Sequence, residues 1–270
     1  MARDGSQPND GGIGGRHTTS RSPGTLYVIS TPIGHPDDIT LRALATLRRV
    51  AIIASEDPCV TQALLAHHDI TATVTSYGPL NRREKMLLLL DRLMQGQDVA
   101  LVSDNGTPVI YDPGSLLVAG AYQAGIPVKA IPGPSIVTAA TAISGFGGDA
   151  ILFEGHLPPT RLRLERYLSQ HGKERRTLVC CVASLALTRL LEILTQILPK
   201  RQIAVVMNLT TSRETIYRGR PRELLDQIGR VPKDSAVTVV IEGYMAGSQK
   251  RKMGKNATTY SSSRRRMRTR

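Results

Sequence analysis

The sequence predicts a protein of two α/β domains with a ligand cleft between them. Short runs rich in β-branched residues alternate with helical patterns from residue 24 to residue 244, as in largely parallel sheets whose strands are linked by helices. Turns rich in Pro and Gly follow three of these runs. A glycine-rich break at 145–149 divides the pattern into two halves, and ligand clefts commonly form at such junctions.

Seven segments have the composition of strands, and we expect each half of the chain to carry four or five strands. The segments are residues 25–30, 51–55, 99–103, 128–131, 177–182, 202–207 and 236–241. Helices are expected over 82–95, 114–124, 135–144 and 161–171. Because Gly96, Gly125 and Gly172 follow three of these helices, we expect each glycine to close its helix in the left-handed conformation.

Changes in composition predict the domain boundaries. Residues 1–23 are rich in Gly, Ser and Asp, and residues 246–270 are basic, and neither stretch has the apolar periodicity of a core. We therefore expect a disordered N-terminus (1–23), an N-terminal domain (24–145), a C-terminal domain (146–245) and a disordered basic tail (246–270).

The composition excludes several classes of protein. Of the 270 residues, 41% are hydrophobic, which excludes a wholly disordered chain. Three cysteines, of which Cys180 and Cys181 are adjacent, do not make a disulfide framework and are typical of a reducing, cytoplasmic compartment. No run approaches the roughly 20 apolar residues that a membrane-spanning helix needs, so we expect no membrane partner.

The net charge of +13 is concentrated at one end of the chain. Residues 246–270 hold nine basic residues and no acidic one, which leaves 26 basic and 22 acidic residues and a net charge of +4 in the remainder. A basic tail favours salt-sensitive contacts with nucleic-acid phosphates. A solubilising tail without a specific partner remains the alternative.

Three turns between strands and helices carry the strongest indication of a ligand site. They are Ser30–Gly34, Ser103–Pro108 and Ile131–Ser135. Proline stiffens such turns and glycine lets a ligand approach the backbone closely. Each turn alone could be a tight turn before a helix, with Asp38 and Ser135 as good N-cap residues. Three of them at successive strand ends favour a site for a polar small molecule.

Other familiar sites lack support. The glycine-rich stretch at 11–15 follows no strand, so it is not a phosphate-binding loop. The six histidines and three cysteines show no paired metal-ligand spacing, so we expect no metal. No Gly-x-Ser-x-Gly nucleophile motif is present either.

Taken together, the motifs identify a family resemblance. Residues 24–34 and 38–44, with Ser103-Asp104, Gly106-Thr107-Pro108, Asp112-Pro113-Gly114 and 131–135, resemble the tetrapyrrole methylase superfamily. Within it, the chain is most similar to the branch that methylates a cytidine ribose 2′-hydroxyl in small-subunit (16S) ribosomal RNA. The likeness runs from about residue 24 to 243, with 153–158 and 241–243 as further landmarks.

The resemblance implies a homodimer of subunits with mixed sheets and S-adenosylmethionine in the cleft between the two domains. It implies that the cofactor contacts residues of the three loops, namely Thr31, Pro32, Ile33, Gly34, Asp104, Gly106, Thr107, Pro108, Gly133, Pro134, Ser135 and Ile136. Backbone amides and one acid can satisfy the cofactor's carboxylate, ribose and adenine. Its cation also favours acidic neighbours, for which Asp104 and Asp112 are candidates.

Methyl transfer needs an in-line approach of two bound reactants, so positioning can supply much of the catalysis. A ribose hydroxyl is a poor nucleophile and gains from a base or hydrogen-bond acceptor. Glu56, Asp57 and Glu84 are our catalytic candidates, since their segments should face the cleft. The structural alternative for Glu56 and Asp57 is a helix N-terminus neutralised by its own acids.

The acceptor side departs from the family pattern. Pro58-Cys59-Val60 replaces Thr-Arg-His, and residues 77–84 echo a polar His/Asn/Glu-rich stretch only at Asn81 and Glu84. In the second domain, residues 180–185 replace Tyr-Glu-Ser-Pro-His-Arg, and residues 206–211 replace Ala-Arg-Glu-Leu-Thr-Lys. We predict a methyltransferase of small-subunit ribosomal RNA. A methyltransferase of tetrapyrroles or other small molecules is one alternative, and a catalytically impaired RNA- or ribosome-binding homologue is another.

Overall fold

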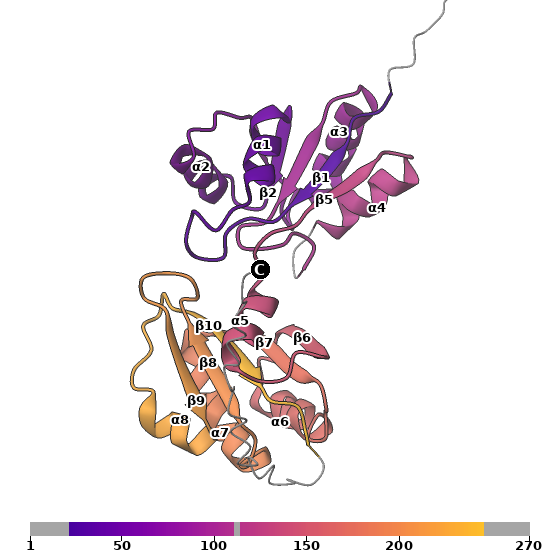
Figure 1. Ribbon diagram of the computed structural model, residues 1–270. Helices are drawn as coiled ribbons and strands as arrows, with labels where there is room; N and C mark the ends of the chain where they lie inside the picture. Colours follow the sequence, from indigo (N-terminus) through magenta and orange to yellow (C-terminus); the bar gives the residue numbers. More distant parts are fainter. Residues whose placement is uncertain (1–21, 111–113, 246–270) are drawn as a thin grey trace, which may run out of the picture.

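The structure is a computed structural model and describes residues 22–110 and 114–245. Two lobes follow one another along the chain, each built on a five-stranded sheet (Figure 1). The N-terminal stretch, the basic tail and Asp112 of the sequence analysis lie outside the described residues. Within those residues, no helix combines the length and apolarity needed to cross a membrane.

The first sheet is entirely parallel, with the strand order β3-β2-β4-β1-β5. Its strands are β1 (Leu26–Ile29), β2 (Ile52–Ser55), β3 (Val74–Ser76), β4 (Val99–Val102) and β5 (Val128–Ile131). The helices that connect them are α1 (Leu41–Arg49), α2 (Pro58–His67), α3 (Arg82–Met94) and α4 (Ser115–Gln123). All five strands therefore end at the same edge, where the loops that follow them gather.

Alternation along the strands produces two cores in this lobe. Tyr27 and Ile29 pack with α1 and α2 on one face, whereas Leu26 packs with α3 and α4 on the other. Successive side chains of a strand point to opposite faces, and both faces of a parallel sheet are normally covered by helices. The arrangement is the helix–sheet–helix sandwich that the alternating sequence pattern predicts.

The second sheet is mixed, with the order β6-β7-β10-β8-β9. Its strands are β6 (Ile151–His156), β7 (Thr177–Ala183), β8 (Ile203–Met207), β9 (Thr215–Gly219) and β10 (Ala236–Ile241). The helices are α5 (Ile136–Ser144), α6 (Arg161–Gln170), the 3-10 turn η1 (Ser184–Ala186), α7 (Leu187–Ile197) and α8 (Pro221–Gln227). β10 is antiparallel to both β7 and β8, and β6 is parallel to β7, so β6, β7 and β8 share one carboxyl edge.

The position of α5 differs from the expected domain organisation. From the glycine-rich break at 145–149 we expected this helix to belong to the first domain. In the structure, Ala140 packs with Val179, Ala204 and Val240 of the second sheet. α6, α7 and α8 cover the opposite face of that sheet. By packing, the chain passes from one lobe to the other before α5, at the turn that follows β5.

Several local expectations are confirmed and others are wrong. All seven expected strands are present, but β3, β6 and β9 were not among them. Gly96 and Gly125 adopt positive φ angles of 86° and 68°, and the next residue of each donates to the carbonyl five residues earlier. Gly172 does not adopt a positive φ angle, and after it the chain turns again through a Glu174 N–H to His171 carbonyl hydrogen bond. α1 is capped by the Thr40 hydroxyl rather than by Asp38, since the helix begins only at Leu41. Ser135 occupies the N-cap position of α5, as expected, but its hydroxyl makes no capping hydrogen bond.

Candidate cofactor cleft

The loops after β1 and β4 are joined at the carboxyl edge of the first sheet. The Thr31 N–H donates to the Gly106 carbonyl oxygen over 2.9 Å, and the Thr31 hydroxyl donates to the Ser103 carbonyl oxygen over 2.8 Å. Thr31 is buried, so these bonds are shielded from competing water. The Thr31 side chain therefore fixes the two loops relative to each other.

A second set of bonds adds the loop after β5. The hydroxyl oxygens of Ser30 and Thr107 lie 2.9 Å apart, and the Thr107 hydroxyl is 3.3 Å from the Pro134 carbonyl oxygen. A hydroxyl has one proton, so when Thr107 donates to Pro134 it accepts from Ser30. Because β1 lies between β4 and β5, this relay spans all three motif loops.

Close backbone approach explains two of the glycines in these loops. Gly34 faces the second lobe, and a Cβ atom there would lie 2.2 Å from the Leu209 carbonyl oxygen. Gly106 has a φ angle of 82°, which L side chains rarely adopt, and a Cβ there would lie 3.2 Å from the Ile33 side chain. The loops thus need glycine where they pass closest to their neighbours.

An open cavity of about 610 Å³ lies where these loops meet the second lobe. Four of the predicted cofactor residues line it, namely Ile33, Gly133, Pro134 and Ser135. The other lining residues are Asp37, Asp38, Ile39, Thr40, Thr138, Ala139, Ala142 and Thr210. Ligand cavities commonly measure about 300–1,000 Å³, so the space fits a nucleoside-sized molecule.

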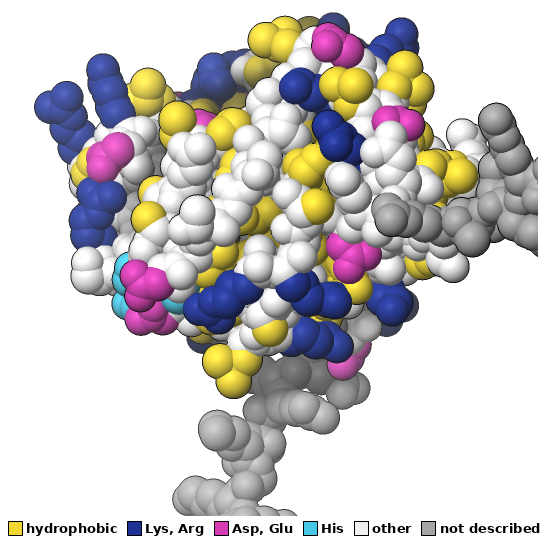
Figure 2. Space-filling view, turned by 90° about the horizontal axis from the view of Figure 1, so that it is seen from above, with side chains coloured by type: hydrophobic (Ala, Val, Ile, Leu, Met, Phe, Trp, Pro, Cys, Tyr) yellow, Lys and Arg dark blue, Asp and Glu magenta, His cyan; other side chains and the backbone are white. Residues whose placement is uncertain are grey.

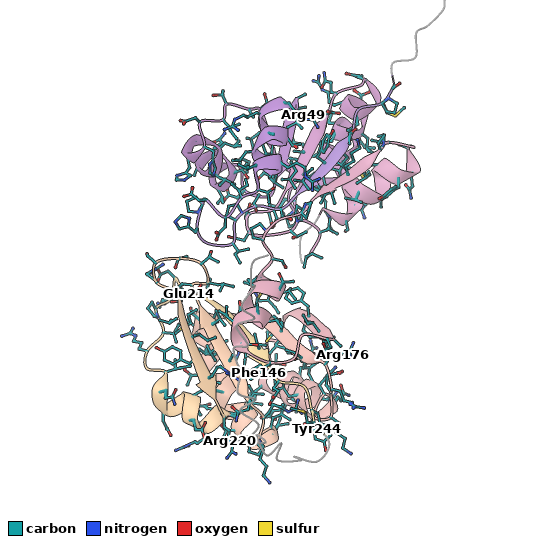
Figure 3. The ribbon with its side chains drawn as sticks, viewed as in Figure 1. Arg49, Phe146, Arg176, Glu214, Arg220 and Tyr244 are labelled. Carbon is teal, nitrogen blue, oxygen red and sulfur yellow. The ribbon has the colours of Figure 1, made fainter. Side chains whose placement is uncertain are left out.

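Thr210 brings the second lobe to this cavity. Its hydroxyl accepts a hydrogen bond from the His35 N–H over 2.9 Å, and its own N–H donates to Glu214 over 2.6 Å. Figure 3 shows Glu214 at the end of the second lobe that faces the first. The loop after β8 is therefore held in place by Glu214 while it contacts the loop after β1.

Most of the remaining cofactor candidates hold the loops rather than line the cavity. Pro32, Gly106 and Pro108 lie in the loops after β1 and β4, and Ile136 packs beside Ile33 against the core around α5. The Asp104 carboxylate accepts a hydrogen bond from the Asp57 N–H over 3.0 Å. Asp104 thereby connects the loop after β4 to the loop after β2, its neighbour on the far side from β1.

The three catalytic candidates lie at the same sheet edge but not in the wall of the cavity. The Asp57 carboxylate accepts a hydrogen bond from the Cys59 N–H over 2.8 Å and so caps α2, which is the structural alternative for this residue. Glu56 is exposed directly after β2 and lies against Gly78 of the loop after β3. Glu84 is exposed in the first turn of α3, where an acid suits the positive end of the helix dipole.

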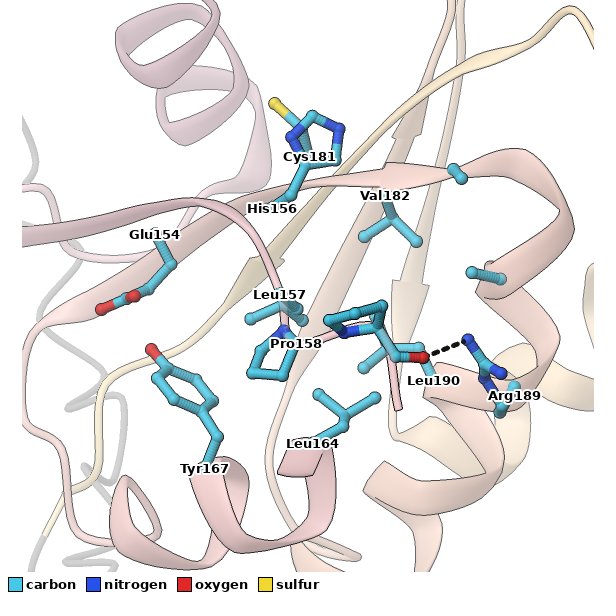
Figure 4. Close-up of a pocket in the computed structure, with 13 residues that line it drawn as sticks. Glu154, His156, Leu157, Pro158, Leu164, Tyr167, Cys181, Val182, Arg189 and Leu190 are labelled. Atoms are coloured by element: carbon cyan, nitrogen blue, oxygen red, sulfur yellow. Dashed lines mark hydrogen bonds between the residues drawn. The ribbon is translucent and has the colours of Figure 1, made fainter. Parts of the chain in front are cut away.

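A second cavity, of about 680 Å³, lies at the carboxyl ends of β6 and β7 (Figure 4). Cys181, Val182 and Ala183 line it, so it includes the segment that departs from the family pattern. Most of its wall is apolar, with Leu157, Pro158, Pro159, Leu164, Ala186 and Leu190 contributing. The Arg189 guanidinium closes one side by donating to the Pro159 carbonyl oxygen over 3.1 Å.

One end of this cavity is polar. In Figure 4 the Tyr167 hydroxyl points toward the Glu154 carboxylate. Burial, together with that carboxylate, raises the pKa of Tyr167 above its usual value, so the phenol stays neutral in neutral solution. Burial likewise raises the pKa of the Cys181 thiol, which disfavours the nucleophilic thiolate.

Several lining residues were not among the predicted cofactor contacts. Asp37, Asp38 and Thr40 follow the first motif on the same loop, and the segment Asp37–Thr40 was already conspicuous in the sequence. Thr138, Ala139 and Ala142 lie on one face of α5, since Ala142 follows the other two by four and three residues. For Thr210 the sequence contained only a weak indication of a role in the site. Thr210 follows a predicted strand and lies in the segment 206–211, which departs from the family pattern.

Comparison with known proteins extends these observations to most of the chain. The family model for tetrapyrrole (corrin/porphyrin) methylases matches residues 25–225. Proteins named ribosomal RNA small subunit methyltransferase I are similar to this chain. The one from Thermotoga maritima is 36% identical over 82% of this chain and 99% of its own length, and the one from Synechocystis is 40% identical over 73% and 71%.

Solved structures confirm the fold at low sequence identity. A cobalt precorrin-4 methyltransferase superposes with a TM-score of 0.59 at 20% identity, over 81% of this chain and 94% of its own. A uroporphyrin-III C-methyltransferase from Thermus thermophilus, in complex with S-adenosyl homocysteine, gives 0.56 at 19% identity over 81% and 97%. With its three motif loops, two α/β lobes and matching family model, the chain belongs to the tetrapyrrole methylase family.

Proposed function

We propose that the protein is an S-adenosylmethionine-dependent methyltransferase that methylates a ribose 2′-hydroxyl of small-subunit ribosomal RNA. The observation that carries this proposal is the cavity between the lobes, which the hydrogen-bonded motif loops form with Thr210. Similarity to proteins named ribosomal RNA small subunit methyltransferase I, over most of the chain, supports the acceptor.

The residues of the cavity fit such a cofactor. A Cβ at Gly133 would lie 3.0 Å from the Ser30 side chain, so the glycine lets the loops after β1 and β5 pack closely beside the cavity. Ser135 and Thr138 offer hydroxyls for a ribose or a carboxylate. Asp38 supplies negative charge that suits a sulfonium cation. When bound, the cofactor supplies an activated methyl group. The residues of the chain hold and orient the two reactants, which is the main requirement for in-line transfer.

Among the catalytic candidates we favour Glu56 as the hydrogen-bond acceptor for the ribose hydroxyl. Asp57 is the N-cap residue of α2, and Glu84 lies within the first turn of α3, so both acids have a role in a helix N-terminus. Glu56 is exposed at the sheet edge, directly after β2. A carboxylate in this position can orient the hydroxyl and take up its proton as the new bond forms.

We propose further that the protein acts as a homodimer in the cytoplasm, where its RNA substrate would be found. Leu80, Leu87 and Leu88 on and before α3 are exposed by 103%, 66% and 53%, and a second copy would cover them. Figure 2 shows Lys and Arg side chains on several sides of the molecule, with a group of them along the lower edge of this view, where they could contact RNA phosphates.

A second candidate function rests on the apolar cavity of the second lobe. Cys181, Val182 and Ala183 line it in the segment where the family pattern places an acid and two cations. An apolar wall suits an apolar methyl acceptor such as a tetrapyrrole. It is also consistent with a protein that binds the cofactor but does not transfer its methyl group to RNA.

The decisive experiment combines cofactor binding with methyl transfer. Purified full-length protein is titrated calorimetrically with S-adenosylmethionine and S-adenosylhomocysteine, and is then assayed on small ribosomal subunits that lack the modification. Saturable binding and transfer to RNA are expected. Binding with transfer only to a tetrapyrrole would favour the second candidate, and a folded protein that binds neither cofactor form would contradict both.

Asp104 offers a site-directed version of this test. Asp104→Ala removes the carboxylate that accepts from the Asp57 N–H at the sheet edge, and we expect cofactor binding to be lost in a folded protein. Asp234→Ala is the matched control, since Asp234 is exposed in the second lobe and pairs with Arg213. Retained affinity in the Asp104 variant would remove Asp104 from the site.

A further inference from the structure

A cluster of metal-ligating side chains lies beside the cofactor cleft. One ring nitrogen each of His67 and His68 and one carboxylate oxygen of Asp37 lie within 4.8 Å of one another. Figure 2 shows histidine side chains next to acidic ones at the surface of this lobe. The cluster is accessible to ions from solvent, because Asp37 and His67 are exposed and His68 is half-buried.

The fold creates this cluster from segments 30 residues apart. Asp37 belongs to the loop between β1 and α1, whereas His67 ends α2 and His68 is its C-cap residue. The expectation of no metal rested on spacing along the chain, and adjacent histidines with a distant Asp give no recognisable pattern. The packing of α1 and α2 on one face of the sheet brings the two segments together.

The donor atoms are close to the separations that a metal requires. The His67 Nε2 and Asp37 Oδ1 atoms are 2.8 Å apart. Ligands about 2.0–2.1 Å from a tetrahedral Zn²⁺ lie about 3.3 Å from one another, so an ion fits after shifts of an ångström or so. The His68 Nε2 atom lies 3.0 Å from the Pro36 carbonyl oxygen. Such carbonyl contacts fix the ring orientation of metal-bound histidines in many proteins.

The local charges favour a cation. The last turn of α2 presents the negative end of the helix dipole, and Asp37 contributes a carboxylate. Arg48 is the nearby cation, and it donates to the His68 carbonyl oxygen over 3.1 Å. Its contact is with the backbone and not with the ring nitrogens or the Asp37 carboxylate.

We propose that Asp37, His67 and His68 bind a divalent transition-metal ion of the Zn²⁺ type. Two imidazole nitrogens and a carboxylate oxygen form a donor set that suits Zn²⁺. Solvent completes the coordination shell, because the cluster lies at the surface. Ca²⁺ and Mg²⁺ are disfavoured, since they prefer sites made of oxygen ligands.

The ion would link α2 to the wall of the cofactor cleft. Asp37 lines the cleft cavity, and two residues earlier the His35 N–H donates to the Thr210 hydroxyl of the second lobe. A metal bound to Asp37 and α2 therefore restrains the loop that contacts both the cavity and the second lobe. Its role is structural, and methyl transfer needs no electron or proton from it.

The test measures Zn²⁺ binding to the metal-free, full-length protein by competition with a chromogenic chelator. We expect one equivalent to bind to the wild type and thermal unfolding to shift to higher temperature. Asp37→Asn and His67→Ala should each weaken binding at least about tenfold. His156→Ala is the matched control, because His156 is an exposed histidine of the second lobe, and it should bind as the wild type does.

The same proteins are loaded with Co²⁺ to identify the ligands. Absorption bands of nitrogen and oxygen ligation, without a thiolate charge-transfer band, are expected for the wild type. A thiolate band would assign the metal to a cysteine such as Cys59 and overturn the proposal. Equal Zn²⁺ affinity in the wild type, Asp37→Asn and His67→Ala, or no binding to the wild type, would overturn it as well.

Discussion

The carboxyl edges of the two sheets are built differently. In the first lobe, Ser30, Thr31 and Thr107 join three loops through hydroxyl and carbonyl groups. In the second lobe, the ends of β6 and β7 surround a mostly apolar cavity lined by Cys181, Val182 and Ala183. Hydrogen bonds demand particular donors at particular positions, whereas apolar walls tolerate many side chains. The polar edge of the first lobe is therefore more constrained in its side chains than the apolar edge of the second.

The largest expected effect is at the contact between the two edges. In Gly34→Val the new Cβ would lie 2.2 Å from the Leu209 carbonyl oxygen, so the backbone of one loop must move. We expect a loss of about 2–3 kcal/mol in the free energy of unfolding and a loss of cofactor binding. Urea unfolding and calorimetry measure the two effects.

The control for this variant is Gly147→Val. A Cβ at Gly147 meets no atom within 4 Å, so the same side chain should be tolerated there. If Gly34→Val binds the cofactor with unchanged affinity, the close contact between the lobes does not shape the cavity.

A charge placed in the apolar cavity tests the acceptor side. Ala183→Arg introduces a long cation beside Cys181 and Val182, and under the second candidate function we expect kcat/KM for an apolar acceptor such as a tetrapyrrole to fall about tenfold, or 1.4 kcal/mol. Cofactor affinity should not change, because the cavity between the lobes does not include these residues. Steady-state kinetics and calorimetry separate the two outcomes. An unchanged kcat/KM would exclude the second cavity from acceptor binding.

Asp57 and Glu56 separate a structural acid from a catalytic one. Asp57→Ala removes the cap of α2 and should cost about 1 kcal/mol of stability. Glu56→Gln should leave stability unchanged and lower kcat, because an amide is a poor proton acceptor. Thermal unfolding and single-turnover kinetics provide the measurements. Equal kcat values for Glu56→Gln and the wild type would remove Glu56 from catalysis.

The hydroxyl relay of the first lobe is tested by Thr107→Val. Loss of the contacts with Ser30 and Pro134 should destabilise the protein by about 1 kcal/mol and weaken cofactor binding. Thr195→Val removes a hydroxyl bonded only to its own helix and should not affect the cofactor. A Thr107 variant with normal affinity would mean that the relay is dispensable for the cavity.

The smallest effect concerns an ion pair at the amino-terminal end of β7. Arg176 directly precedes this strand and pairs with Glu174. Its guanidinium lowers the pKa of Glu174 to about 2 from an ordinary value of 4.5. The ionised pair therefore contributes stability above pH 4.5, which is lost as the pH falls toward 2. Arg176 is about half exposed, so solvent screens the pair and we expect its contribution to stability to be small.

Urea unfolding of the wild type and Glu174→Gln at pH 7 and pH 3 measures this contribution. The variant should lose less stability on acidification than the wild type. Glu165→Gln is the control, since Glu165 pairs with Arg161 on the exposed side of α6. Identical acid sensitivity of Glu174→Gln and the wild type would show that the pair contributes nothing.

The sequence predicted the regular elements of the sheets well. Strands such as β4 and β8 are buried along their whole length and read as continuous apolar runs. β3 has only three residues, and β9 is an edge strand with mostly exposed side chains, so neither has a strong apolar signal. Gly145 marks the end of α5 and not the boundary between the lobes, because a C-terminal glycine records local backbone geometry alone.

By itself the sequence determined the α/β class, the three motif loops and the family, because these depend on periodicity and on short runs of Pro and Gly. Only the tertiary structure decided that α5 belongs to the second sheet, that Thr210 completes the cavity and that Asp37 meets His67 and His68. Each of these depends on contacts between segments far apart in the chain. Such contacts follow from packing, which no local pattern of residues encodes.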